Sequence, residues 1–233
     1  MRKSSADRLA AAIPPALYGG LVVLLAAAWV ANAGVRAAAH NPRMGEHLVY
    51  ASPMEMLFSA DSGRLFVLCQ GSDEVRVLNA ATYAEIRRIP VGHMPRGFSF
   101  SHDAGRMFVA NSWDDTVSVI DTHSLQVVAT WQVRGEPSSA FEDREGKRLF
   151  VANRVSNDVA VLNARTGVEE KRLAAGRGAS YITPSRDSDR IYVTHVYPNP
   201  TRESTENGNR IAPQSEITVI DRSEEHTSEL QSP

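Results

Sequence analysis

The sequence predicts an all-β fold, a β-propeller of four-stranded blades, and three observations support this prediction. The first is an apolar tripeptide that recurs every 42 residues, with its middle residue at Phe66, Phe108, Phe150 and Tyr192. The second is a proline that keeps the same period, at Pro53, Pro95 and Pro137. The third is that no stretch beyond residue 40 shows sustained helical spacing of apolar residues. A repeat of this length that reads as four short strands is typical of a propeller blade.

The four strands of a blade are clearest in the second repeat. Apolar or alternating segments at residues 97–100, 106–111, 116–121 and 126–131 are separated by short polar stretches. The third segment alternates β-branched residues, which favours a strand. Asp103-Ala104-Gly105 predicts a turn, because glycine accepts the positive φ that tight turns need. We therefore expect an antiparallel sheet with these four strands in chain order.

The fourth repeat is longer than the others. The third strand closes on Asn or Asp in every repeat, and the interval from Asn163 to Asp221 is one period plus 16 residues. The extra residues lie between His195 and Ile217, so we expect a long loop there. Residues 45–221 amount to about four blades, and a ring of seven such blades would need about 294 residues. We therefore expect an arc that is part of a larger, seven-bladed ring.

Residues 1–44 predict an export segment with an apolar helix. Leu17–Val30 is nearly continuous apolar sequence, no charge lies between Arg8 and Arg36, and the segment has a net charge of +4. Ala31-Asn32-Ala33 supplies a small-x-small cleavage site, so a cleaved signal peptide and an uncleaved signal anchor with a linker both stay open. A buried Ala/Leu helix of a soluble domain is the alternative. Both export interpretations place the propeller outside the cytoplasm, in the periplasm or at the cell surface, secreted or anchored to the inner membrane.

The composition excludes several classes of function. The net charge is −2, and the propeller repeats carry −4, so there is no electrostatic reason to bind nucleic acid. The single cysteine, Cys69, excludes an intramolecular disulfide and a CxxCH haem-attachment motif. The sequence contains no nucleophile elbow, HExxH motif or phosphate-binding glycine loop. It therefore favours a binding protein over an enzyme, and it predicts no metal and no cofactor in this chain.

Two strand ends carry a resemblance to a known family. Phe108–Asn111 and Phe150–Asn153 both read Phe-Val-Ala-Asn, and each precedes a Val-x-Val-[Ile/Leu]-[Asp/Asn] strand. These residues resemble the repeats of YVTN-family β-propellers, which include surface-layer-like and YncE-like propellers, over residues 50–221. Cys69 and His195 depart from the pattern, since they stand where the repeat has Asn. The resemblance implies an extracytoplasmic, seven-bladed propeller; some such propellers are joined to cytochrome c modules, and lactonase-like enzymes have a similar architecture.

The repeat pattern ends at Asp221. Residues 222–233, which are rich in Ser, Thr and Glu, do not continue it and resemble the conceptual translation of a short-read sequencing adapter. A genuine polar tail is the alternative, because this composition is also common in disordered segments. We expect the tail to be non-native and the chain to be truncated, so that the fourth strand of the fourth blade is missing.

One face of the predicted propeller carries most of the variation between repeats. In an up-and-down blade, the loops between the second and third strands share a face with the connections from one blade to the next. Loops displayed on a rigid scaffold are the usual location of binding residues. The candidate ligand- or partner-binding residues on this face are His93, Arg96, Trp113, Asp114, Arg154, Arg177 and His195.

Each candidate has two interpretations. The arginines line an anionic pocket or are ordinary surface charge. Asp114 beside Trp113 holds a cation or a sugar, or is simply solvated. His93 with Met94 suggests axial haem ligation, but no attachment motif accompanies the pair. His195 belongs to a site, or it only satisfies backbone groups as the Asn it replaces would.

The leading interpretation is an extracytoplasmic scaffold that binds a protein or a small molecule through this face and has no catalysis of its own. The first alternative, implied by the resemblance, is the propeller component of a periplasmic electron-transfer protein or oxidoreductase, with haem in a cytochrome c-type module lost beyond Asp221. The second alternative is a lactonase-like hydrolase. A membrane is a partner only if the N-terminal helix is uncleaved, and no nucleic-acid partner is expected.

Overall fold

A computed structural model of the chain describes residues 51–186 and 189–197 and the strand segments 205–206, 209–210, 216–221 and 227–231. The predicted signal peptide or anchor helix at 1–44 lies outside the described residues. In the part that is described, no helix is long and apolar enough to cross a membrane. Apart from one short 3-10 turn, Gln70–Ser72, the regular elements described are all β-strands.

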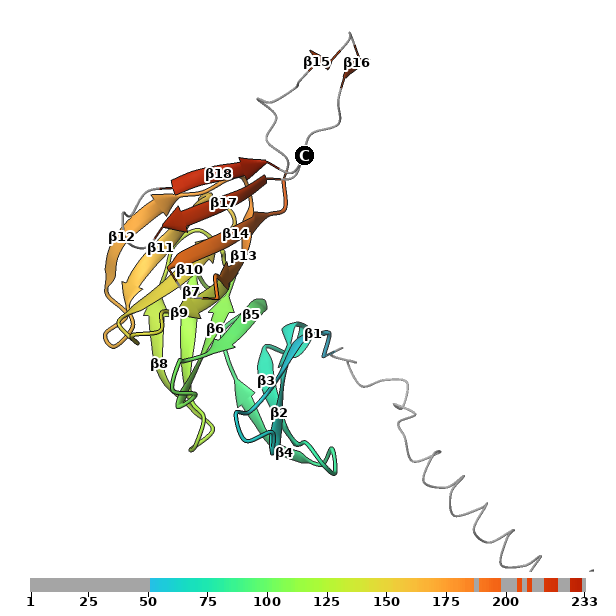
Figure 1. The fold of residues 1–233 in the computed structure, drawn as a ribbon. Helices are drawn as coiled ribbons and strands as arrows, with labels where there is room; N and C mark the ends of the chain where they lie inside the picture. The colour runs from blue at the N-terminus through green and yellow to red at the C-terminus, as the bar shows by residue number, and fades with distance from the viewer. Residues whose placement is uncertain are drawn as a thin grey trace, which may run out of the picture. The chain divides into compact units, whose positions relative to one another are not determined.

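The strands form four antiparallel four-stranded sheets, here called blades 1 to 4 (Figure 1). Blade 1 contains β1 (Pro53–Phe58), β2 (Arg64–Cys69), β3 (Glu74–Asn79) and β4 (Glu85–Pro90). Blade 2 contains β5 (Pro95–Phe100), β6 (Arg106–Asn111), β7 (Thr116–Asp121) and β8 (Gln126–Gln132). Blade 3 contains β9 (Pro137–Glu142), β10 (Arg148–Asn153), β11 (Asp158–Asn163) and β12 (Glu169–Ala174). Blade 4 contains β13 (Ala179–Pro184), β14 (Arg190–His195), β17 (Glu216–Asp221) and β18 (Thr227–Gln231).

The predicted fold class is confirmed. In the second repeat, every observed strand begins and ends within two residues of its predicted bounds. The turns explain why the repeat keeps Asn or Asp at the end of the third strand. Asp121 Oδ1 accepts the N–H groups of His123 and Ser124 at 3.1 and 2.7 Å. Asn79 and Asn163 cap the corresponding turns in the same way, as Asx turns do.

The hydrophobic cores lie at the seams, which is our name for the interfaces between neighbouring blades. On β6, Met107 and Val109 pack into the seam with blade 1, whereas Phe108 between them packs into the seam with blade 3. β10 repeats this alternation towards blades 2 and 4. Because successive side chains of a strand point to opposite faces, a strand buried on both faces needs an unbroken apolar run. The tripeptide is therefore the strongest signal in the sequence.

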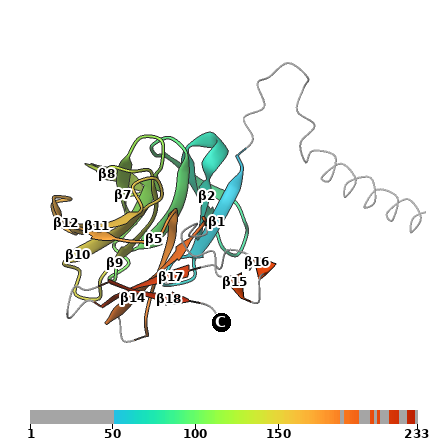
Figure 2. The same ribbon diagram turned by 90° about the horizontal axis from the view of Figure 1, so that it is seen from above.

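The first strand of a blade lies towards the inside of the arc and the fourth towards the outside. Figure 2 shows β8 and β12 outside β5 and β9, and their side chains are mostly exposed or half-buried. The polar sequence of β9 is buried all the same. Ser138 Oγ lies 2.8 Å from the carbonyl oxygen of Ser180, and Ser139 Oγ accepts the N–H of Ile182 at 3.4 Å. The serines of this inner strand thus join blade 3 to blade 4.

Blade 4 confirms the predicted insertion and corrects one expectation. Between β14 and β17 the chain forms a small separate hairpin of β15 (Thr205–Glu206) and β16 (Asn209–Arg210). The fourth strand was expected to be missing, but β18 pairs antiparallel with β17 (Figure 1). Backbone groups alone make a strand ladder, so a segment outside the repeat pattern can occupy this edge. That residues 222–233 are non-native stays a prediction.

Arginines at the start of the second strands bridge the seams on the turn face, where the turns between the first and second strands lie. Arg64 Nη1 donates to the carbonyl oxygen of Thr122 at 2.8 Å, and Arg106 Nη1 donates to that of Ala164 at 2.6 Å. Arg106 Nη2 also donates to Glu142 Oε1 at 2.7 Å, and the Glu142 side chain is only 2% exposed. Burial raises the pKa of Glu142, and the hydrogen bond from the backbone and the charge of Arg106 oppose that rise.

We expect Arg106→Met to lower the free energy of unfolding by about 4 kcal/mol, because it leaves the buried carboxylate of Glu142 without its cation. Urea denaturation of the variant and the parent protein measures the difference.

Arg64→Met is the matched control, since Arg64 occupies the same position one repeat earlier and its hydrogen bond is to a carbonyl oxygen, with only a minor charge interaction with exposed Asp61. We expect it to cost about 1.5 kcal/mol. Equal losses in the two variants would contradict the assignment of the larger effect to Glu142.

Candidate functional site

The loops between second and third strands meet the blade-to-blade connections on one face, here called the loop face. Three residues spaced by 42 make the junctions: Asp73, Asp115 and Asn157, with φ of 52, 54 and 57°. Asp115 Oδ1 accepts the N–H groups of Gly135 and Glu136 at 3.2 and 2.8 Å. Asp73 and Asn157 accept the corresponding N–H groups of their own connections. Sequence reasoning missed this set, although its 42-residue period was visible.

Three predicted site residues come together between blades 1 and 2. His93 Nδ1 lies 2.5 Å from Asp73 Oδ2, and the His93 N–H donates to Asp114 Oδ2 at 2.7 Å. The ring of Trp113 packs edge-on against the imidazole, with centroids 5.0 Å apart, and Trp113 is 59% exposed. His93 therefore ties two loops together. The Asp114 carboxylate is partly engaged in this structural contact.

A second group gathers Arg96 and Arg154. Arg96 is the second residue of β5, and its Nε is buried and has no hydrogen-bond partner among the described residues. Burial lowers the pKa of Arg96, and the charge of Arg154 lowers it further, whereas Glu136 and Tyr197 act in the opposite direction. Arg154 Nη2 donates to Glu136 Oε2 at 2.9 Å. The charges of Arg96, Arg154 and Glu136 therefore act on one another across the seam between blades 2 and 3.

No described contact joins Arg177 to Arg96 or Arg154. It is exposed on the connection between β12 and β13, where its carbonyl oxygen accepts the N–H of Tyr197 at 3.3 Å. Within the described residues, its guanidinium forms no hydrogen bond or ion pair. Of the three predicted arginines, the structure brings together Arg96 and Arg154.

His195 occupies the position of the repeat Asn and makes the equivalent bond. Asn111 Nδ2 donates to Ser118 Oγ at 2.9 Å, and His195 Nε2 lies 2.9 Å from Oγ1 of Thr218, which stands at the same place in blade 4. The chain approaches so closely that a Cβ on Gly176 would lie 2.8 Å from the imidazole. His195 therefore makes the same hydrogen bond as the Asn that it replaces.

Glu55 and Tyr181 were not singled out from the sequence. They occupy the same position in the first strands of blades 1 and 4, and Tyr181 Oη lies 3.5 Å from Glu55 Oε1. Glu55 Oε2 also accepts the N–H of Phe98 at 3.2 Å. Burial raises the pKa of Glu55, and these two hydrogen bonds oppose the rise. The contact joins residues 126 positions apart, and the repeat pattern could not indicate it.

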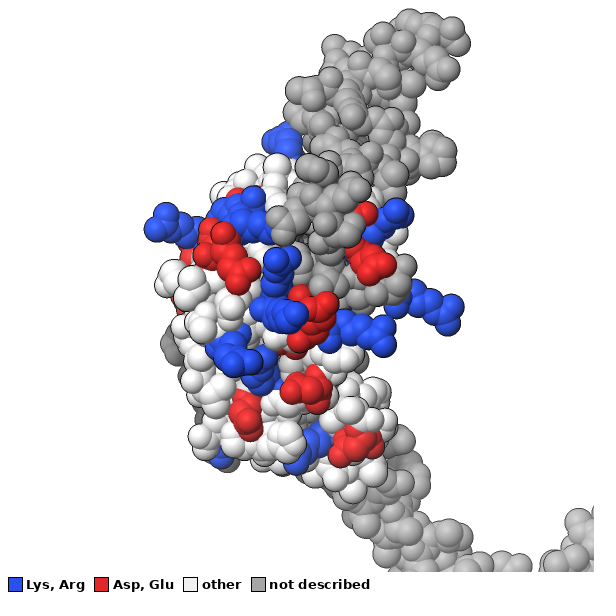
Figure 3. Space-filling model, turned by 60° about the vertical axis from the view of Figure 1, so that its left-hand side comes forward, with Lys and Arg blue, Asp and Glu red and all other residues white. Residues whose placement is uncertain are grey.

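One side of the molecule carries described charges of both signs. On the side shown in Figure 3, basic and acidic side chains are interspersed rather than gathered into one patch of a single sign. Among the described residues, no group of three or more His, Cys, Asp or Glu side chains is arranged to hold a metal ion.

The sequence profile of YNCE-like beta-propellers matches residues 21–196. The chain belongs to this family. Its blades also resemble those of solved structures. Hydrazine synthase of Kuenenia stuttgartiensis superposes with a TM-score of 0.68 at 19% identity, over 82% of this chain and 53% of that one. Dihydro-heme d1 dehydrogenase NirN, solved in complex with DHE, gives a TM-score of 0.56 at 14% identity, over 77% of this chain and 37% of that one.

These likenesses establish a shared propeller fold. The YncE-like chain spans about half of the hydrazine synthase chain and a smaller part of the NirN chain. No curated protein sequence matches it. Any activity of the larger proteins is therefore a matter for proposal.

We expect Glu55→Gln to gain stability relative to the parent protein as the pH rises from about 4 to about 7. The folded-state pKa of Glu55 is raised, so its contribution to stability is full below the unfolded pKa and is lost as the pH passes the folded pKa. The uncharged Gln avoids that loss. The difference in Tm between variant and parent at the two pH values measures it.

Glu85→Gln is the control of opposite sign. The hydrogen bond from Arg88 lowers the pKa of Glu85, so ionised Glu85 stabilises the fold above its unfolded pKa. This variant should lose stability relative to the parent over the same pH range. A Glu55→Gln difference that is independent of pH would refute the assigned shift.

Proposed function

We propose that this YncE-like propeller is an extracytoplasmic scaffold without catalysis of its own, which binds a protein or a small molecule through its loop face. We propose that the bound group of the ligand is anionic and that Arg96 and Arg154 form its binding site. The observation that carries the proposal is that the Nε atoms of both Arg96 and Arg154 are buried without a hydrogen-bond partner among the described residues.

An unsatisfied buried donor on a charged group is costly to a fold, and native proteins keep few of them. Here the cost is increased by Arg154, whose charge lowers the pKa of Arg96. Glu136 is the carboxylate bonded to Arg154, and its side chain is 33% exposed. A carboxylate or phosphate group on a ligand would supply acceptors to both guanidinium groups, in charge-assisted hydrogen bonds. Binding would thereby offset a defect that the free protein carries.

The extracytoplasmic location rests on the sequence. The basic and apolar pattern of residues 1–44 is that of an export signal or an anchor. If the segment is cleaved the propeller is secreted or periplasmic, and if it is retained the membrane becomes a partner.

We expect Arg96→Met to weaken the binding of inorganic phosphate or succinate at least about tenfold at constant ionic strength. The same variant should unfold at an unchanged or higher urea concentration, because the Arg96 side chain has no hydrogen bond to lose within the described residues. Isothermal titration gives the affinity, and urea denaturation gives the stability.

Arg134→Met is the matched control, since Arg134 is an exposed arginine two residues from Glu136 on the same face. Its affinity should equal that of the parent. Anion binding that survives Arg96→Met, or that falls equally in both variants, would sink the proposal.

A second candidate function is a propeller component of an electron-transfer protein or oxidoreductase. The observation in its favour is that two structures with the same fold are described as hydrazine synthase and dihydro-heme d1 dehydrogenase. Haem would then belong to a module outside this chain. Genomic DNA read across and beyond the codon for Asp221 tests it: a downstream CxxCH motif supports this function, and a gene without one removes its basis.

A further inference from the structure

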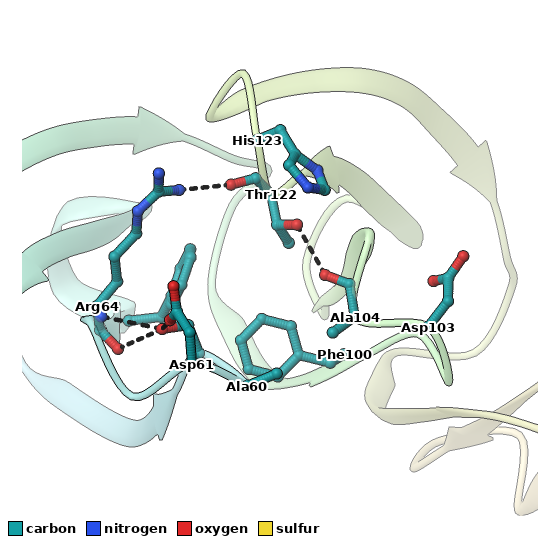
Figure 4. Close-up of a pocket in the computed structure, with 10 residues that line it drawn as sticks. Ala60, Asp61, Arg64, Phe100, Asp103, Ala104, Thr122 and His123 are labelled. Carbon is teal, nitrogen blue, oxygen red and sulfur yellow. Dashed lines mark hydrogen bonds between the residues drawn. The ribbon is translucent and has the colours of Figure 1, made fainter.

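The seam between blades 1 and 2 holds a cavity of about 270 Å³ on the turn face, opposite the loop face (Figure 4). The turns between β1 and β2, between β5 and β6 and between β7 and β8 surround it. Its apolar wall includes Phe66 and Phe100, whose rings meet edge to face with centroids 5.4 Å apart. Arg64 lines it from the side of blade 1 and donates to the carbonyl oxygen of Thr122 across the seam.

The next seam shows what the same framework does with a carboxylate. Glu142 stands there at the position of Phe100, one repeat later. Its Oε1 accepts from Arg106 Nη2 at 2.7 Å, and its Oε2 accepts the N–H of His102 at 2.8 Å. One guanidinium and one turn amide thus hold the two oxygens of one carboxylate.

The first seam keeps both donors and lacks the acceptor. Arg64 is the counterpart of Arg106, and Ala60 is the counterpart of His102. Within the described residues, no carboxylate lies within ion-pair distance of Arg64, and the N–H of Ala60 donates to no acceptor. Blade 2 has Phe100 at the position where blade 3 has Glu142. The first seam therefore holds an open pocket with the same pair of donors, where the second seam is filled by an ion pair.

We propose that this pocket binds a small monocarboxylate with an apolar body. The ligand carboxylate takes the place that Glu142 fills in the next seam, between the guanidinium of Arg64 and the N–H of Ala60. The apolar body rests against Phe66 and Phe100. A cavity of about 150 Å³ is enough for benzene in another protein, so the volume here admits an aromatic acid of benzoate size.

Two aspartates restrict the charge of the ligand. Asp61 and Asp103 also line the cavity, and each is bonded within its own turn, to a serine hydroxyl and a glycine N–H. In Figure 4 Asp103 lies at the edge of the pocket, on the side away from Arg64. A second negative charge on the ligand would meet these carboxylates, which is why we propose a monoanion rather than a dianion.

The test is a titration of the protein with benzoate, followed by amide resonances in NMR spectra. Saturable shifts at Ala60 and Thr122 are expected, with benzamide, the neutral analogue, binding at least about tenfold more weakly. Arg64→Met should weaken benzoate binding at least about tenfold, because it removes the cation. Phe100→Glu should abolish it, because this variant builds the internal carboxylate of the next seam into the pocket.

Two control variants show whether benzoate binding is specific to this pocket. Arg144→Met removes an exposed arginine of a turn on the same face, and Arg96→Met removes the loop-face candidate; neither should change benzoate binding at Ala60 and Thr122. Since Arg64→Met removes only a bond to a carbonyl oxygen, the proposal stays testable even if Phe100→Glu does not fold. No saturable shift at Ala60 and Thr122, equal affinity for benzamide, or binding unaffected by Arg64→Met would overturn it.

Discussion

The structure depends on one constraint: the middle strands of a blade become buried only between two neighbouring blades. Met107 and Phe108 are adjacent in sequence and are both fully buried, yet they belong to different cores. A single blade therefore cannot bury its own apolar side chains. Each seam must also provide hydrogen-bond partners for the polar groups at its two ends. The Asx turns, the capping residues of the loop face and the arginines that cross the seams serve this second need.

The two candidate sites follow from the same balance of charge. Arg154 has Glu136 and Arg106 has Glu142, so each guanidinium is neutralised inside the fold. Arg96 and Arg64 form no such ion pair among the described residues: Glu136 is bonded to Arg154, and Asp61 is bonded within its own turn. A repeat protein makes these gaps visible, because its other copies show how the position is normally completed. The two gaps lie on opposite faces, so we expect the ligands proposed for them to bind independently.

Much of the fold was predictable from the sequence because its determinants are local or periodic. The apolar tripeptide, the turn aspartates and asparagines and the length of the insertion all follow from residue order. The caps Asp73, Asp115 and Asn157 could have been found by the same period. The contact of Glu55 with Tyr181 could not, since it depends on how the arc brings its ends together. β18 was missed because backbone pairing does not require the repeat pattern.

The candidate site was less predictable than the fold. The sequence predicted that His93, Trp113 and Asp114 share one face. Their mutual contacts, and the hydrogen bond of His195 to Thr218, became visible only in the structure. The pocket beside Arg64 was not predicted from the sequence. Phe100 gains its meaning only when its counterpart in the next repeat, Glu142, is seen bonded to Arg106 in the structure. Some partners across a seam do repeat, such as Arg64 with Thr122 and Arg106 with Ala164, but the residue order does not show which side chains meet.

The caps of the loop face have a consequence for folding. Each of Asp73, Asp115 and Asn157 accepts an N–H group of the connection that leaves its own blade. This junction therefore needs no residue of the next blade's strands. The hydrophobic core of the seam, in contrast, also requires the second strand of the next blade. The cap joins residues only 21 positions apart, so closing it costs less chain entropy than bringing the strands of two blades together. Local caps of this kind favour the contact of each blade with its sequential neighbour over contact with a more distant blade.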